Sequence, residues 1–125
     1  MLKVSRALAL LFAVGLAIGE AAMNWGDWQW WPLWVVDYVC VAWLLGGVAA
    51  TRGGAPSAWL TSGWAFTAGI FYMALFVWLD EFRNHPEQLA AQLPMIRTIG
   101  AMLALCVVGG GLAALAARRP PAAAE

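Results

Sequence analysis

The sequence predicts an all-α, integral membrane four-helix bundle formed by a single domain. Of its 125 residues, 63% are hydrophobic and only 11% are charged, and a soluble domain of this size could not bury so much apolar surface. The apolar residues are gathered into four runs of about 20 residues, the length that crosses a bilayer. Backbone groups in lipid need internal hydrogen-bond partners, and the chain shows no sustained β alternation, so we expect each run to be a helix.

The four runs are separated by short polar or aromatic connections. A Trp-rich loop at 24–32 and a turn at 51–58 connect the first three runs, and a polar segment at 80–94 precedes the last. The last residues, 119–125, are expected to form a disordered tail. The expected helices cover residues 4–23, 33–50, 59–79 and 95–117.

The segment 80–94 contains its own helix signals. Pro86 suits the first turn of a helix, where its missing N–H costs nothing. Leu89 and Leu93 lie four residues apart and therefore share one helix face. We expect a short amphipathic helix on the outer surface, ended by Pro94.

The basic residues are distributed unequally between the two sides of the predicted membrane. Cytoplasmic loops carry an excess of Lys and Arg, so the more basic side is assigned to the cytoplasm. This predicts that both termini are cytoplasmic and that the protein is a multi-pass protein of the inner (plasma) membrane. Arg83 and Arg97 lie on or near the outer side, and the inner side holds Lys3, Arg6, Arg52, Arg118 and Arg119.

Several polar residues fall inside the predicted spans, near their outer ends: Glu20, Asp37, Tyr38, Tyr72 and Arg97. A charged group in lipid is costly, so each is a functional-site hypothesis. In one interpretation Arg97 pairs with Asp37 or Glu20 and locks the helices together, because a guanidinium can engage a carboxylate through two hydrogen bonds. In the other, a spare carboxylate binds a proton or a cation, and Asp37, the deeper acid, is the better candidate.

Tryptophan is concentrated at the same outer level. Its apolar ring and polar N–H suit the membrane interface, which explains an anchoring belt. Tryptophan is also enriched at protein–protein hot spots, so the cluster could instead dock a partner. A third interpretation is a platform for a lipid headgroup, quinone, pigment or cationic ligand, the last through cation–π contacts. The residues concerned are Trp25, Trp28, Trp30, Trp31, Trp34 and Trp78.

Small residues predict where helices pack closely in lipid. They gather in the inner halves of the last three runs, which predicts a bundle that is narrow at the cytoplasmic end, whereas the first run has small residues at its outer end and is expected to pack closely there. Such faces serve packing within one chain or between chains, so the oligomeric state stays open. The third run carries one heptad-spaced face of Ala58, Ser62, Ala65, Gly69, Tyr72 and Phe76. The packing residues are Gly15, Gly19, Gly46, Ser62, Gly69 and Gly110.

Other classes of function find no support in the sequence. The net charge is zero, which argues against nucleic-acid binding because phosphates require a basic surface. Cys40 and Cys106 lie at different depths of apolar runs and are expected to be free. His85 is the single histidine, so no clustered zinc ligands are present. With no cofactor motif and no nucleophile–base pair, we expect a non-enzyme without a metal or cofactor.

The sequence therefore favours a small polytopic protein whose partners are the lipid bilayer and other membrane protein subunits. In this interpretation it is an accessory or assembly subunit of a larger membrane complex and makes contact through its aromatic outer rim. The alternative is a small carrier or binder of a lipophilic or cationic ligand. It would use an outward-facing, Trp-rich cup that contains Glu20 and Asp37.

Overall fold

The computed structural model describes residues 1–26 and 31–118 and confirms an all-α four-helix bundle. Helices α1, α3 and α4 are long and apolar enough to cross a membrane, whereas the apolar run of α2, Trp34–Ala50, is shorter. The tail expected at 119–125 lies outside the described residues. The elements are α1 (Leu2–Asn24), α2 (Trp31–Ala50), α3 (Ala58–Asn84), a 3₁₀ turn η1 (Pro86–Gln88) and α4 (Leu89–Ala117).

The turn between α2 and α3 is closed by local hydrogen bonds. The Thr51 hydroxyl donates to the carbonyl of Gly47 at 3.0 Å, which satisfies an acceptor at the end of α2. Gly54 adopts a φ of +83°, a conformation that suits glycine because it has no Cβ. Ser57 then caps α3, since its hydroxyl accepts from the Trp59 backbone N–H at 3.2 Å.

The junction between α3 and α4 differs from the expectation. α3 continues to Asn84, and α4 begins at Leu89 and runs through Pro94, so the residues expected to form a separate amphipathic helix are the first turns of α4. Pro94 lacks the N–H that would bond to the carbonyl of Ala90. Its own carbonyl still accepts, and the Thr98 hydroxyl donates to it at 3.0 Å. One missing hydrogen bond near the start of a long helix does not end it.

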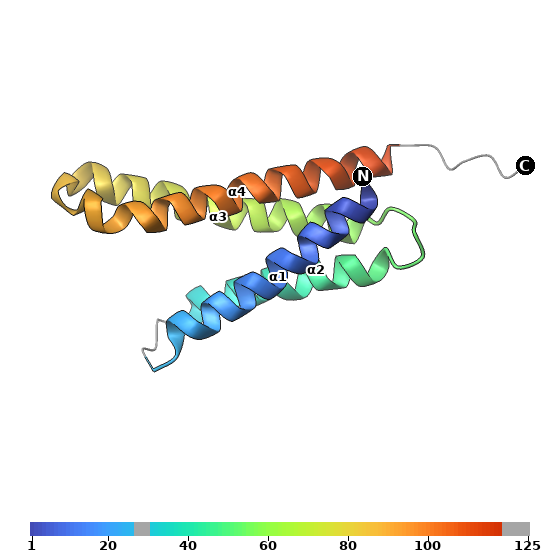
Figure 1. Ribbon diagram of the computed structural model, residues 1–125, viewed down its shortest axis with the longest axis horizontal. Helices are drawn as coiled ribbons and strands as arrows, with labels where there is room; N and C mark the ends of the chain where they lie inside the picture. The colour runs from blue at the N-terminus through green and yellow to red at the C-terminus, as the bar shows by residue number, and fades with distance from the viewer. Residues whose placement is uncertain (27–30, 119–125) are drawn as a thin grey trace, which may run out of the picture.

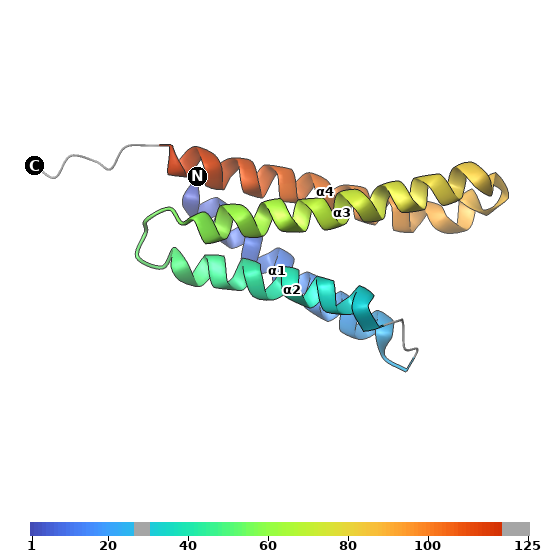
Figure 2. The ribbon, with the colours of Figure 1, turned by 180° about the vertical axis from the view of Figure 1, so that it is seen from behind.

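The helices form two hairpins, α1–α2 and α3–α4 (Figures 1 and 2). α1 packs against α2 and α4, while α3 packs against α2 and α4. The hairpins converge at the end that holds the N-terminus and the 51–57 turn, and they diverge toward the opposite end. We call these the inner and outer ends, after the predicted orientation. The narrow inner end agrees with the expectation from the small residues.

A buried tryptophan joins the two hairpins in the inner half. The Trp64 side chain is fully buried, and its indole N–H donates to the Ser5 hydroxyl at 3.1 Å. Ser5 in turn donates to the carbonyl of Gly109 at 2.8 Å, so one chain of hydrogen bonds links α3, α1 and α4. Phe12 meets both Trp64 and Phe71 edge to face, with centroids 5.7 and 5.5 Å apart. This cluster fixes where the hairpins meet.

Candidate functional site

Two carboxylates lie on the core-facing sides of α1 and α2, toward the outer end. Glu20 follows buried Leu16 by four residues, and Asp37 precedes buried Cys40 by three. These spacings place each carboxylate on the buried face of its helix. Both side chains are half-buried, and their charges act on one another. The arrangement is therefore a pair of half-buried acids on neighbouring helices.

Neighbouring polar groups hold this part of the α1–α2 hairpin in place. The Asn24 amide donates to the Glu20 carboxylate at 2.9 Å and to the Glu20 backbone carbonyl at 3.0 Å. The Tyr38 hydroxyl donates to the carbonyl of Ala17 at 3.3 Å and so ties α2 to α1. The ring of Trp34 meets Tyr38 edge to face, with centroids 5.9 Å apart. The site is thus built on a braced pair of helices.

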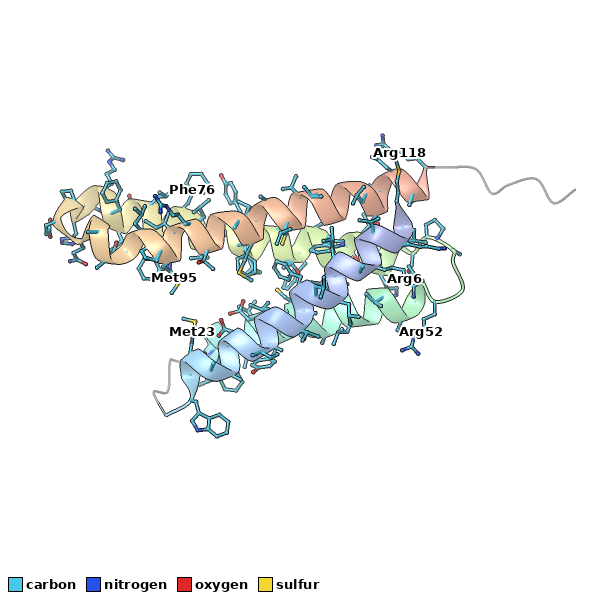
Figure 3. All side chains as sticks on the ribbon, viewed as in Figure 1. Arg6, Met23, Arg52, Phe76, Met95 and Arg118 are labelled. Atoms are coloured by element: carbon cyan, nitrogen blue, oxygen red, sulfur yellow. The ribbon has the colours of Figure 1, made fainter. Side chains whose placement is uncertain are left out.

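Half-buried side chains of the α3–α4 hairpin toward the outer end are apolar or aromatic. Trp78 lies seven residues after buried Phe71, and Met95 lies four residues before buried Ile99. Both Trp78 and Met95 are half-buried and pack against the core. Figure 3 shows Met95 of α4 and Met23 of α1 pointing toward one another where the two hairpins diverge. The core-packed side of the α3–α4 hairpin is therefore apolar and aromatic toward the outer end.

Arg97 does not join the two carboxylates. It lies two residues from both Met95 and Ile99, which is about 200° around a helix, and its side chain is exposed. Among the described residues, the acid–base pairs within 4 Å all involve His85 near the outer end. The expected ion pair with Asp37 or Glu20 is absent there because Arg97 occupies the opposite face of α4.

Tyr72 is also separated from the carboxylates. It is 53% exposed on α3 and packs its ring against Phe76, with centroids 4.6 Å apart. The residues expected to form one polar cluster are thus divided: Glu20, Asp37 and Tyr38 belong to the α1–α2 hairpin, and Tyr72 and Arg97 lie on exposed faces of the other. The whole heptad-spaced face of α3 is exposed, namely Ala58, Ser62, Ala65, Gly69, Tyr72 and Phe76.

Apart from Gly110, the small residues at which the helices approach one another differ from those expected. Of the expected glycines, Gly110 meets the side chain of Trp64, where a Cβ would lie 3.2 Å away, whereas the space beside Gly15, Gly19, Gly46 and Gly69 is open. Ser62 is exposed. The first helix therefore lacks the expected close packing at Gly15 and Gly19. Small residues occur on several faces of each helix, and only the tertiary structure selects one. The close approaches are at Gly47, Gly63 and Gly109.

The tryptophans expected at the outer rim are only partly described. Trp28 and Trp30 lie outside the described residues. Trp25 and Trp31 are 88% and 62% exposed. Trp34 and Trp78 are half-buried within the hairpins. Two of the four described rim tryptophans are thus exposed to lipid or a partner.

Sequence reasoning missed Ser5 and Trp64, which tie the hairpins together. A signal for them was present, because Trp64 lies within a predicted span and a buried indole N–H requires an acceptor. Ser5 lies near the inner end, as Trp64 does, and its hydroxyl accepts the hydrogen bond from the Trp64 indole.

The geometry of the described residues is the basis for inferring a function. No protein-family model, curated protein or solved structure matches the chain. Within residues 1–26 and 31–118, no group of three or more His, Cys, Asp or Glu side chains is placed to hold a metal ion. The acid pair and the apolar side chains at the outer end of the α3–α4 hairpin are the features with the most specific chemistry.

Proposed function

We propose that this multi-pass membrane protein binds a cationic, lipophilic ligand between its two hairpins at the outer end. The observation that carries the proposal is the position of Glu20 and Asp37. Both lie on core-facing helix sides where the hairpins diverge, and no basic side chain of the described residues lies within 4 Å of them. Intramembrane acids face a bundle interior when they serve a substrate or ion.

The opening offers complementary chemistry for such a ligand. A single positive charge placed between the two carboxylates would offset their mutual repulsion. The indole of Trp78 and the thioether of Met95 would contact the apolar part of the ligand, and an aromatic ring also attracts a cation. An organic ammonium or phosphonium ion fits this combination better than Ca²⁺, which takes six to eight oxygen ligands.

Replacing Asp37 with asparagine tests the proposal. Asp37→Asn keeps the shape of the side chain but removes one negative charge, so tetraphenylphosphonium should bind at least about tenfold more weakly, or ~1.4 kcal/mol. Glu20→Gln should weaken binding in the same direction. Isothermal titration calorimetry on the protein in lipid nanodiscs measures both variants.

Asp80→Asn is the matched control, because Asp80 is an exposed acid at the outer end of α3. It should bind the probe as the wild type does. Equal affinities for wild type, Asp37→Asn and Glu20→Gln would contradict the proposal, as would an equal loss in the Asp80 control. Binding should also weaken as the pH falls, because protonated carboxylates lose their attraction for the cation.

A second candidate function is that of an accessory or assembly subunit. It is favoured by the exposed heptad-spaced face of α3, whose small residues would allow a partner helix to approach closely. Trp25 and Trp31 add exposed aromatic surface at the outer end, and tryptophan is enriched at interface hot spots. The partner would be another membrane protein subunit.

Native mass spectrometry of the protein extracted in mild detergent tests this second function. The wild type should appear in a stoichiometric complex with other subunits. Ala65→Leu should abolish that complex, because a larger side chain blocks close approach on the exposed face of α3. Ala104→Leu, on an exposed position of α4, is the control and should leave the complex intact. A monomer in every sample would refute the subunit role.

A further inference from the structure

The inner end of the bundle concentrates positive charge. Lys3, Arg6, Arg52 and Arg118 all lie there, and Figure 3 shows the three arginines at this end. None of the described carboxylates lies at the inner end, since those of α1 and α2 face the outer opening and the rest lie near the α3–α4 junction. The inner end is therefore complementary to an anion.

A groove between α1 and α2 provides a place for such an anion. It has a volume of about 340 Å³ and combines two basic side chains with an apolar floor. Lys3 is exposed at its edge, and Arg6 is half-buried. The groove is lined by Lys3, Arg6, Ala7, Leu10 and Val48.

Arg6, which lines this groove, carries a hydrogen-bond donor that has no partner in the described part of the chain. Its Nε atom is buried and has no hydrogen-bond partner within the described part of the chain. Buried polar groups in proteins are nearly always hydrogen-bonded, so an orphaned donor of this kind calls for an acceptor. A guanidinium matches the oxygens of a phosphate particularly well.

We propose that this groove binds the phosphate of an anionic phospholipid. Arg6 and Lys3 would hold the phosphate oxygens, and the first turn of α1 would add the positive end of its helix dipole. One acyl chain would lie along Ala7, Leu10 and Val48. The apolar floor distinguishes a lipid from free phosphate, and basic pockets between membrane helices bind acidic headgroups by the same chemistry.

Native mass spectrometry of protein released from nanodiscs tests this site. In discs of mixed phosphatidylglycerol and phosphatidylcholine, the wild type should retain one phosphatidylglycerol under activation that removes phosphatidylcholine. Arg6→Gln should lower the retained fraction about tenfold, because it removes the guanidinium that holds the phosphate. Ala7→Phe should lower it too, because the added ring fills the groove without changing its charge.

Arg83→Gln is the matched control, because Arg83 is an exposed arginine at the outer end of α3. It should retain the lipid as the wild type does. Retention by Arg6→Gln equal to that of the wild type would overturn the proposal, and so would an equal loss in the Arg83 control. If Arg6→Gln does not fold by circular dichroism, Lys3→Gln and Ala7→Phe decide the question in the same way.

A separate measurement distinguishes the lipid from free phosphate. Phosphatidylglycerol should raise the melting temperature of the protein in phosphatidylcholine discs, whereas inorganic phosphate added to the same discs should leave it unchanged. Equal stabilisation by inorganic phosphate would overturn the lipid assignment. The result is independent of the cation site, which lies at the opposite end of the bundle.

Discussion

Trp64 of α3 packs closely against Gly109 of α4. The indole lies so close to the α4 backbone that a Cβ on Gly109 would clash with three of its ring atoms. Gly109 also supplies the carbonyl that Ser5 uses. The Trp64 ring can therefore be buried there only because Gly109 has no side chain.

Gly109→Ala should destabilise the protein by about 1–3 kcal/mol, the usual cost of overpacking a core. Gly111→Ala is the matched control, because the space beside Gly111 is open and alanine favours a helix by ~1 kcal/mol over glycine. Thermal unfolding in detergent compares the two variants with the wild type. A Gly109→Ala protein as stable as the Gly111→Ala protein would contradict the close packing of Trp64.

At the scale of elements, the length and composition of the apolar runs predicted the helices better than single residues predicted their ends. The apolar runs located all four helices, because a backbone in lipid has few alternatives to a helix. Their ends were less well predicted: α3 continues to Asn84 and α4 begins at Leu89. Taken alone, Pro94 predicts the end of a helix. The neighbouring turns of α4 keep their hydrogen bonds, so the helix continues through it.

The same limit applies to helix faces. The heptad spacing on α3 was visible in the sequence, yet the face is exposed. The face that packs against the core contains Leu60, Trp64 and Phe71, all of them large. Close packing on α3 therefore comes from large side chains that meet glycines of α2 and α4, and from Gly63, which meets Trp43 of α2.

At the scale of the whole molecule, two hairpins are joined at one end. Gly47 brings α2 against α3, since a Cβ there would lie 2.6 Å from the Leu60 Cα. Ser5 joins α1 to α4 through the carbonyl of Gly109. Both contacts lie in the inner half, so the outer halves are free to diverge (Figures 1 and 2). This divergence turns two core-facing acids into a candidate binding site.

The predicted orientation places both termini in the cytoplasm. A single cysteine at Asn84 should then react with a membrane-impermeant maleimide in intact cells, whereas one at Gly53 should react only after permeabilisation. The native Cys40 and Cys106 are buried, so they should contribute little background. The reverse labelling pattern would contradict the orientation.

The sequence by itself predicted the membrane class and located the four helices and the ionisable groups along them. These follow from local properties, because the bilayer fixes the length and composition of a span. Which side chains meet was decided by the tertiary structure. Glu20 and Asp37 share an opening, Arg97 points away from it, and Arg6 and Lys3 share a groove. Those relations depend on helix rotation and on the contacts at Ser5, Trp64 and Gly109, which link residues far apart in the chain.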